Sequence, residues 1–116
     1  MNKAEKNALM VKAILAARAF IERIGMNILD MDYPTTHGVI PLVAMDDGVL
    51  VYVNVAVNEV IPVTHIRRYR ARMRDYMDEQ HLVNTVRYDS ISIKVIAADR
   101  ALLRHHRNIG DAEGEV

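Results

Sequence analysis

Two runs of apolar and β-branched residues dominate the middle of the chain, and a short polar turn separates them. Residues 39–45 form the first run, residues 46–48 (Asp-Asp-Gly) the turn, and residues 49–57 the second run. Asp-Gly between such runs predicts a β-hairpin, because glycine tolerates the positive φ that the turn requires. In the second run five valines alternate with Leu50, Tyr52, Asn54 and Ala56. Both faces are largely apolar, so we expect a central strand covered on both sides.

Two other stretches have helical periodicity. Residues 3–24 contain no proline or glycine and repeat apolar residues at helical spacing, with Asn2 as a candidate N-cap and Gly25 as the stop. Residues 65–80 predict a second helix, for which Thr64 is a candidate N-cap. The apolar stripe of this second helix consists of Ile66, Tyr69, Met73, Tyr76 and Met77.

The remaining segments complete an α/β pattern. We expect an extended segment at 26–33, a loop at 34–38 and a strand with one wetter face at 85–97. Asp99 can cap a short last helix that runs to about residue 108 and is closed by Gly110. Pro41 lacks an N–H, so it should lie where the sheet needs no hydrogen bond, or at a bulge. The order predicts one α/β domain in which helices flank a central mixed β-sheet.

Composition narrows the class of protein. The chain has 116 residues, which suits one domain over 1–110 followed by a short acidic tail over 111–116. Basic and acidic residues balance at 15 each. The absence of cysteine excludes disulfides, thiolate nucleophiles and cysteine-based zinc sites. No apolar run approaches the roughly 20 residues of a membrane span, and the N-terminus lacks the apolar core of a signal peptide. We therefore expect a cytoplasmic protein with no membrane partner.

Five segments also match one family in the order and spacing of their apolar and glycine positions. GVIPLVA at 38–44, DG at 47–48 and LVYVNVA at 50–56 correspond to the family pattern G-E-I-D-L-I-A, D-G and L-V-F-V-E-V-K. RYDSI at 87–91 corresponds to R-F-D-V-V, and residues 13–29 correspond to its opening pattern. From about residue 13 to residue 109 the chain thus resembles the YraN-like family of predicted nucleases. The resemblance implies a single restriction-endonuclease-like domain.

The chain departs from this family at the positions that carry its chemistry. Apolar or neutral residues replace four acids and one lysine: Ile14, Val39, Pro41, Asn54 and Ala56. Mg²⁺ prefers carboxylate oxygens, and a lysine two residues after a glutamate on a strand shares its face and can stabilise a phosphate transition state. These replacements cannot do that chemistry. The resemblance therefore implies a divergent member without catalytic or metal-binding residues and without a cofactor, in other words a pseudoenzyme.

Other polar residues have simpler interpretations. Asp46 and Asp47 are expected to form the turn, and Asp30 and Asp32 to lie at the solvated end of a strand. Adjacent His105 and His106 would point about 100° apart on a helix, so they cannot share a metal and are expected on the surface. Asp89 matches a family position, but an ion pair with Arg87 explains it equally well.

The segment HIRRYRARMR at 65–74 has the clearest functional signal. Its candidate nucleic-acid-binding residues are Arg67, Arg68, Arg70, Arg72 and Arg74. Guanidinium groups bind phosphate well, and phosphate contacts dominate nonspecific affinity for nucleic acid. The alternative is a solvated helix whose arginine stems lie over the core and whose charges pair with neighbouring acids. Arg100, Arg104 and Arg107 on the expected last helix could extend a basic patch.

Three functions follow from these observations. We expect a catalytically inactive nuclease-like protein that binds DNA or RNA through the Arg-rich helix. The first alternative is a protein-interaction or dimerisation module whose former active-site face has become apolar. Such a module could form a homo-oligomer. The second is a metal-dependent endonuclease with a rearranged site.

Overall fold

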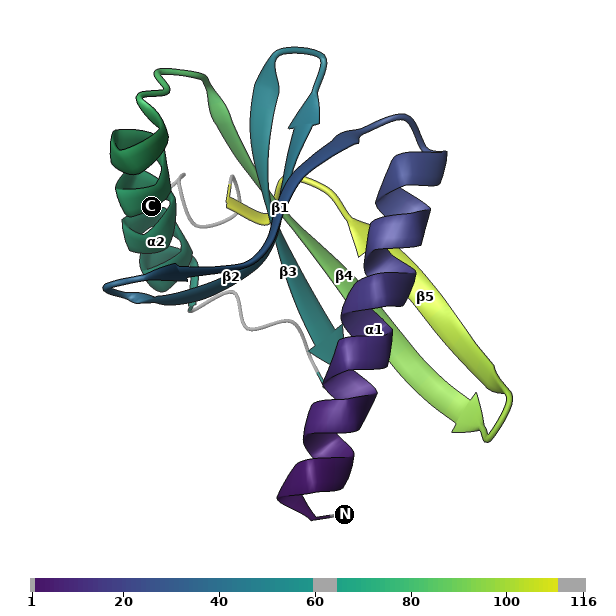
Figure 1. Ribbon diagram of the computed structural model, residues 1–116. Coiled ribbons are helices and arrows are strands. Elements are labelled where there is room, and N and C mark those ends of the chain that lie inside the picture. Colours follow the sequence, from purple (N-terminus) through teal and green to yellow (C-terminus); the bar gives the residue numbers. More distant parts are fainter. Residues whose placement is uncertain (1, 60–64, 111–116) are drawn as a thin grey trace.

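The hydrophobic pattern produces a five-stranded mixed sheet with one helix on each face (Figure 1). The computed structural model describes residues 2–59 and 65–110. The elements are α1 (Lys3–Arg23), β1 (Asn27–Thr35), β2 (Gly38–Asp46), β3 (Val49–Val57), α2 (Ile66–Gln80), β4 (Val86–Ala97) and β5 (Arg100–His106). The strands follow the order β1-β2-β3-β4-β5. The predicted α/β class, with helices flanking a central mixed sheet, is confirmed.

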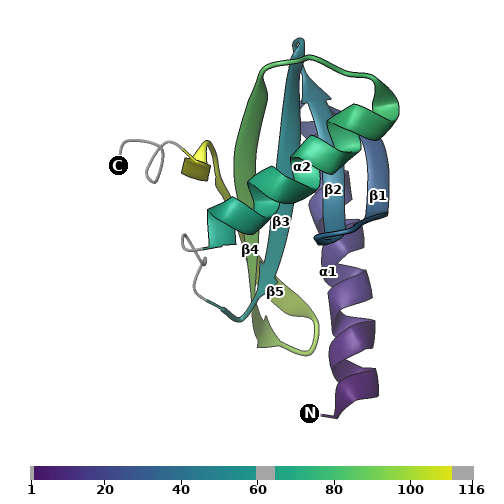
Figure 2. The same ribbon diagram turned by 90° about the vertical axis from the view of Figure 1, so that its left-hand side faces the viewer.

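The position of α2 follows from the direction of the strands. Strands β3 and β4 are parallel, whereas every other neighbouring pair is antiparallel. A parallel pair needs a crossover connection, and the crossover here contains α2. Figure 2 shows α2 in front of the sheet and α1 behind it. No helix in the described ranges 2–59 and 65–110 is both long enough and apolar enough to cross a membrane.

Helix α1 agrees with its prediction. The Asn2 side chain accepts a hydrogen bond from the Glu5 backbone N–H at 2.8 Å, which is the expected N-cap. Gly25 follows the helix with a φ of 98°. Ala17 and Ile21 are fully buried against the face of the sheet that contains Val53. Helix α2 covers the opposite face, where Tyr52 and Tyr76 are buried. Its predicted cap, Thr64, lies outside the described residues.

The hairpin of β2 and β3 is also confirmed. Asp47 and Gly48 both have positive φ, at 48° and 83°, as the turn requires. Pro41 lies between Ile40 and Leu42, which pair with β1, and the pairing of β2 with β3 begins only at Leu42. Asp32, in the corresponding gap of β1, has a φ of 49°. Proline thus occupies a position where the ladder is interrupted, as expected.

The predicted loop at 34–38 is wrong in part, because the strands extend into it. Pro34 and Thr35 belong to β1, and Gly38 begins β2. Proline is tolerated here because β1 is an edge strand of the sheet. The remaining two-residue turn is closed by the Thr35 hydroxyl, which donates to the Gly38 carbonyl at 2.6 Å.

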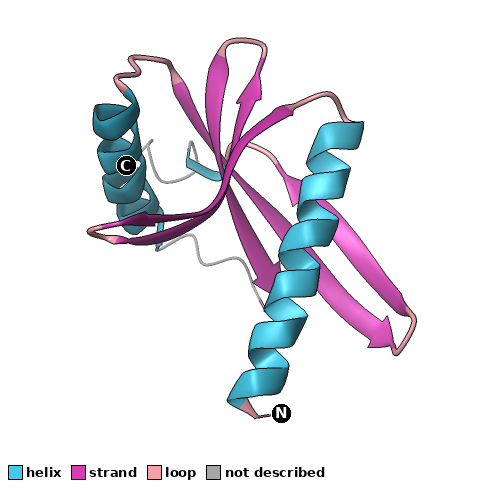
Figure 3. Ribbon diagram, viewed as in Figure 1, coloured by secondary structure: helices cyan, strands magenta, loops and turns pink. Residues whose placement is uncertain are grey.

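The predicted last helix is wrong. Residues 100–106 form β5, which pairs antiparallel with β4 at the edge of the sheet and is drawn as a strand in Figure 3. Leu103 lies opposite Ile93 and packs on the α1 side of the sheet. A short apolar segment is compatible with either a helix or a strand. The unpaired edge of β4 and the apolar layer under α1 select the strand.

Candidate functional site

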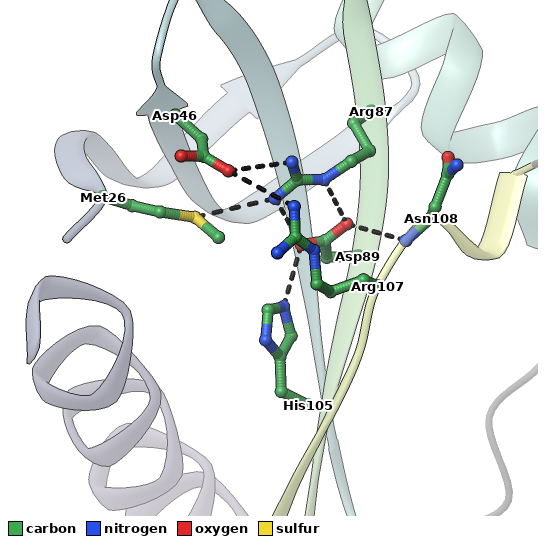
Figure 4. Close-up of polar contacts among 7 residues, drawn as sticks. All are labelled: Met26, Asp46, Arg87, Asp89, His105, Arg107 and Asn108. Atoms are coloured by element: carbon green, nitrogen blue, oxygen red, sulfur yellow. Dashed lines mark hydrogen bonds and ion pairs between the residues drawn. The ribbon is translucent and has the colours of Figure 1, made fainter. Parts of the chain in front are cut away.

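A buried network of charged side chains connects β2, β4 and β5 (Figure 4). The carboxylate of Asp89 on β4 is fully buried and accepts four hydrogen bonds. Arg87 donates from Nε at 2.9 Å and from Nη2 at 3.0 Å. His105 Nε2 lies 2.8 Å from Asp89, and the Asn108 backbone N–H donates at 2.9 Å. The ion pair with Arg87, predicted as one explanation of Asp89, is therefore present.

These hydrogen bonds keep Asp89 ionised. Burial alone would raise the pKa of Asp89, but the hydrogen bonds from Arg87, Asn108 and His105 outweigh it and leave the pKa below its usual value. An ionised carboxylate only accepts hydrogen bonds, so His105 must carry its proton on Nε2. Each oxygen of Asp89 accepts two hydrogen bonds, which leaves no lone pair for a metal ion.

Arg87 extends this network to β2. Its Nη1 lies 2.8 Å from Asp46, and Arg107 Nη2 lies 3.6 Å from the same carboxylate. Hydrogen bonds to Asp89 and then to Asp46 raise the pKa of Arg87, despite its burial. Two carboxylates thus face two guanidinium groups. Such a balanced, internally paired cluster fixes three strands relative to one another and has little charge left for a ligand.

Several sequence-based interpretations need correction here. Asp46 is part of β2 and an ion-pair partner, so its role as a turn former is wrong. His105 and His106 lie on a strand and therefore point to opposite faces of the sheet. The His105 side chain is only 10% exposed and meets the Phe20 ring edge-on, so its expected surface position is wrong too. Alternation of Ala101, Leu103 and His105 was the sequence signal for this strand.

Asp30 was predicted to lie at the solvated end of a strand, but its side chain is half-buried. It accepts a hydrogen bond at 2.7 Å from the hydroxyl of Tyr76 on α2, whose side chain is buried between the helix and the sheet. Burial and this hydrogen bond both raise the pKa of Tyr76. Asp32 is exposed, in agreement with the prediction. Neither carboxylate belongs to a metal-binding group: the described residues contain no cluster of three or more His, Asp or Glu side chains that could hold a metal ion.

The positions matched to the nuclease family do not form one site. Ile14 is 8% exposed and packs in the core between α1 and the sheet. Asn54 and Ala56 alternate with Val53 and Val55, which face α1, so they point to the other face. Asn54 donates to the Ser90 hydroxyl at 3.2 Å. The matched positions on α1 and β3 are thus separated by the sheet.

The five arginines of the predicted binding segment lie on α2 and have different surroundings. Arg67, Arg68 and Arg74 are exposed, whereas Arg70 and Arg72 are half-buried. Arg70 Nη2 donates to the Gly110 carbonyl at 3.4 Å. Within the described ranges 2–59 and 65–110, Arg68 and Arg74 have no ion pair.

Arg72 has a structural role. Its guanidinium donates to the carbonyls of His37 and Val39 at 2.9 and 3.2 Å, and to the Tyr52 hydroxyl at 3.0 Å. Burial raises the pKa of Tyr52 to about 12, although Arg72 opposes the shift. The guanidinium also lies 5.9 Å from the centre of the Tyr69 ring. Arg72 thus attaches α2 to the β1–β2 hairpin, although through carbonyl and hydroxyl oxygens and not through the neighbouring acids that the alternative expected.

Charge is distributed along α2 against the helix dipole. Arg67 and Arg68 lie in the first turn, which contains no acidic residue. Asp78 and Glu79 lie in the last turn, which contains no basic residue. The N-terminal end of a helix has a partial positive charge, so each such side chain costs about 0.3–1 kcal/mol relative to the opposite arrangement. Stability of the helix does not explain this charge pattern.

The fold and these clusters define an α/β protein with an internally paired polar network on one face of its sheet and an arginine-bearing helix on the other. No protein-family model matches the chain, and no curated protein is significantly similar to it. The resemblance to the YraN-like family stays a prediction.

Proposed function

We propose that this protein is a catalytically inactive, restriction-endonuclease-like protein that binds DNA or RNA through α2. The mixed sheet flanked by helices is consistent with the fold that the resemblance implies. The positions of the family's acids and lysine hold Ile14, Val39, Pro41, Asn54 and Ala56, which supply no negatively charged oxygen to a metal ion. The proposed activity is therefore binding without cleavage.

One observation carries the proposal: the N-terminal half of α2 concentrates arginines, and two of them lie in the first turn, where the helix dipole disfavours positive charge. An anion bound at this end would interact favourably with both the arginines and the helix dipole. On α2, Arg68 and Arg74 are exposed and have no ion pair in the described part of the chain, so they can approach phosphates without breaking existing ion pairs. Arg72 is assigned to the structure rather than to the ligand.

The dimerisation alternative has less support. It assumed that Ile14, Val39, Pro41 and Ala56 form an apolar face that a partner covers. Ile14 and Ala56 are only 8% and 3% exposed, because they are covered by the protein's own core, whereas Val39 is 49% exposed. An interface that includes Ile14 and Ala56 would require the sheet and helices to separate.

A salt-titrated binding assay tests the proposal. The wild-type protein is measured against single- and double-stranded DNA and RNA of 12 nucleotides or base pairs, with and without Mg²⁺, and cleavage is followed in the same samples. We expect affinity that falls steeply with salt, needs no Mg²⁺ and is accompanied by no cleavage. Cleavage that depends on Mg²⁺ or Mn²⁺ would support the rearranged metal nuclease instead.

Matched variants locate the binding surface. In Arg68→Gln/Arg74→Gln two charges are removed from α2, and the slope of log K against log salt should fall by about 1.8 for duplex DNA, at about 0.9 per phosphate contact. The control Lys3→Gln/Lys12→Gln removes two exposed positive charges from α1, on the other face of the sheet. Equal losses in both variants would indicate that only net charge matters and would contradict a specific role for α2.

A further inference from the structure

Helix α2 leaves one end of its own sheet face uncovered. Tyr88, Ser90, Ser92 and Lys94 alternate along β4 and face the α2 side. Tyr88 packs under α2, whereas Lys94, further along the strand, is exposed. Figure 2 shows the β4–β5 hairpin extending beyond the helix. Within residues 2–59 and 65–110, no helix covers this end of the face, which lies on the same side of the sheet as α2.

This end of the face is hollowed, and both polar and apolar residues line the hollow. A cavity of about 490 Å³ is lined by Asn58, Glu59, Ser92, Ile93, Lys94, Leu102 and Arg104. Ser92 hydrogen-bonds with His106 Nε2 at 3.1 Å, which adds an imidazole to the same face. Hydroxyl, amide, ammonium and guanidinium groups can all donate hydrogen bonds to phosphate oxygens. Among the lining residues that the structure describes, Glu59 alone is acidic.

Lys94 and Arg104 are two positively charged residues on neighbouring strands of the same face. Ser92 pairs with Arg104 and Lys94 with Leu102, so Lys94 and Arg104 are diagonal neighbours, roughly 7–8 Å apart across the two strands. Neither side chain has an ion pair within residues 2–59 and 65–110. An anion bound between them could contact both positive charges.

Strand β4 fixes the distance from this pair to α2. Arg70 and Arg74 line one hollow together with Tyr88, so they lie beside the start of β4. Lys94 is six residues further along, or about 20 Å at about 3.3 Å per residue. About 20 Å is the length of six base-pair steps at about 3.4 Å each. One short nucleic acid could therefore contact both places.

We infer that the uncovered ends of β4 and β5 contain a second phosphate-binding site for the nucleic acid that binds α2, with Lys94 and Arg104 as the charged contacts. This inference rests on the proposed function. It also gives Arg104 a role in the proposed nucleic-acid contact, although β5 is a strand and not the helix on which a basic extension was expected.

Charge removal and ligand length together test the second site. Lys94→Gln/Arg104→Gln is compared with the wild-type protein and with the control Lys3→Gln/Lys12→Gln, on duplexes of 4 and 12 base pairs. Because only the longer duplex spans about 20 Å, the variant should bind it at least tenfold more weakly, with a salt slope reduced by about 1.8, and bind the shorter one within twofold of wild type. Unfolding midpoints verify that the variant is folded.

A second variant changes affinity in the opposite direction. Glu59→Gln removes the carboxylate from the cavity and should strengthen binding of the 12-base-pair duplex severalfold at low salt, which loss of folding could not imitate. The inference is overturned if Lys94→Gln/Arg104→Gln and Glu59→Gln both bind like wild type while Arg68→Gln/Arg74→Gln loses affinity; the proposed function then stands. A wild-type protein that binds neither duplex overturns both.

Discussion

Replacing Asp89 with asparagine should destabilise the protein more than almost any other single change of charge. The substitution keeps the size of the side chain but removes the negative charge that two side chains, Arg87 on β4 and His105 on β5, and the backbone N–H of Asn108 surround. Arg87, which is 13% exposed, keeps Asp46 as its remaining carboxylate partner. The new amide group also points an N–H toward groups that are themselves donors.

The expected loss in the free energy of unfolding is about 3–5 kcal/mol, the range for removing one partner of a buried ion pair. A domain of this size typically has a total stability of about 5–15 kcal/mol. The unfolding temperature should fall by about 12–20 °C, at about 4 °C per kcal/mol. Circular dichroism during urea and thermal unfolding at pH 7 measures both quantities.

The matched control is Asp47→Asn, which makes the same change of charge in the exposed turn between β2 and β3. Asn tolerates the positive φ of this position, so the free energy of unfolding of the control should stay within about 0.5 kcal/mol of wild type.

The pKa of Asp89 is lowered in the folded protein, so the stability that Asp89 contributes is present above the usual pKa of 3.8 and is lost as the pH falls through the lower, folded value. The difference between Asp89→Asn and wild type should therefore shrink in acid. A loss below about 1 kcal/mol at pH 7 would refute the assigned role of the network.

Three further outcomes are expected. Arg68→Glu should weaken nucleic-acid binding but raise the free energy of unfolding by about 1 kcal/mol, because it replaces an unfavourable charge in the first turn of α2 by a favourable one; equal or lower stability in urea unfolding would contradict the dipole argument. Gly38→Ala should destabilise by about 1–3 kcal/mol, because φ is 119° there and a Cβ atom would lie 2.5 Å from the Arg72 guanidinium. Urea unfolding of Gly38→Ala alone and combined with Arg72→Lys would separate backbone strain from the clash, and no loss in either would exclude both. The pKa of Asp75 should lie below 3.8 in a carboxyl NMR titration and rise in Thr36→Val, since the Thr36 hydroxyl donates to Asp75 at 2.7 Å; an unchanged titration would show that this hydrogen bond is absent in solution.

Some features of the fold depend on residues that are close in the sequence, and others depend on residues that are distant in it. The β2–β3 hairpin and α1 were predictable because their determinants are neighbours in sequence: alternation of apolar residues, an Asp-Gly turn, Asn2 before the helix and Gly25 after it. The charge pattern of α2 was equally visible. The sequence did not show that Arg72 is structural whereas Arg68 and Arg74 are exposed. Arg72 is held by His37, Val39 and Tyr52, which are distant from it in the sequence.

The sequence by itself determined the α/β class, the two helices and the concentration of arginine on the second. Tertiary structure decided that residues 100–106 form a strand, because the open edge of β4 satisfies their backbone hydrogen bonds. It also decided that Asp46, Asp89 and His105 form one network, since they come from three strands that meet only in the folded sheet. Local patterns report the conformation that a segment prefers, whereas edge pairing and buried charge depend on which segments become neighbours.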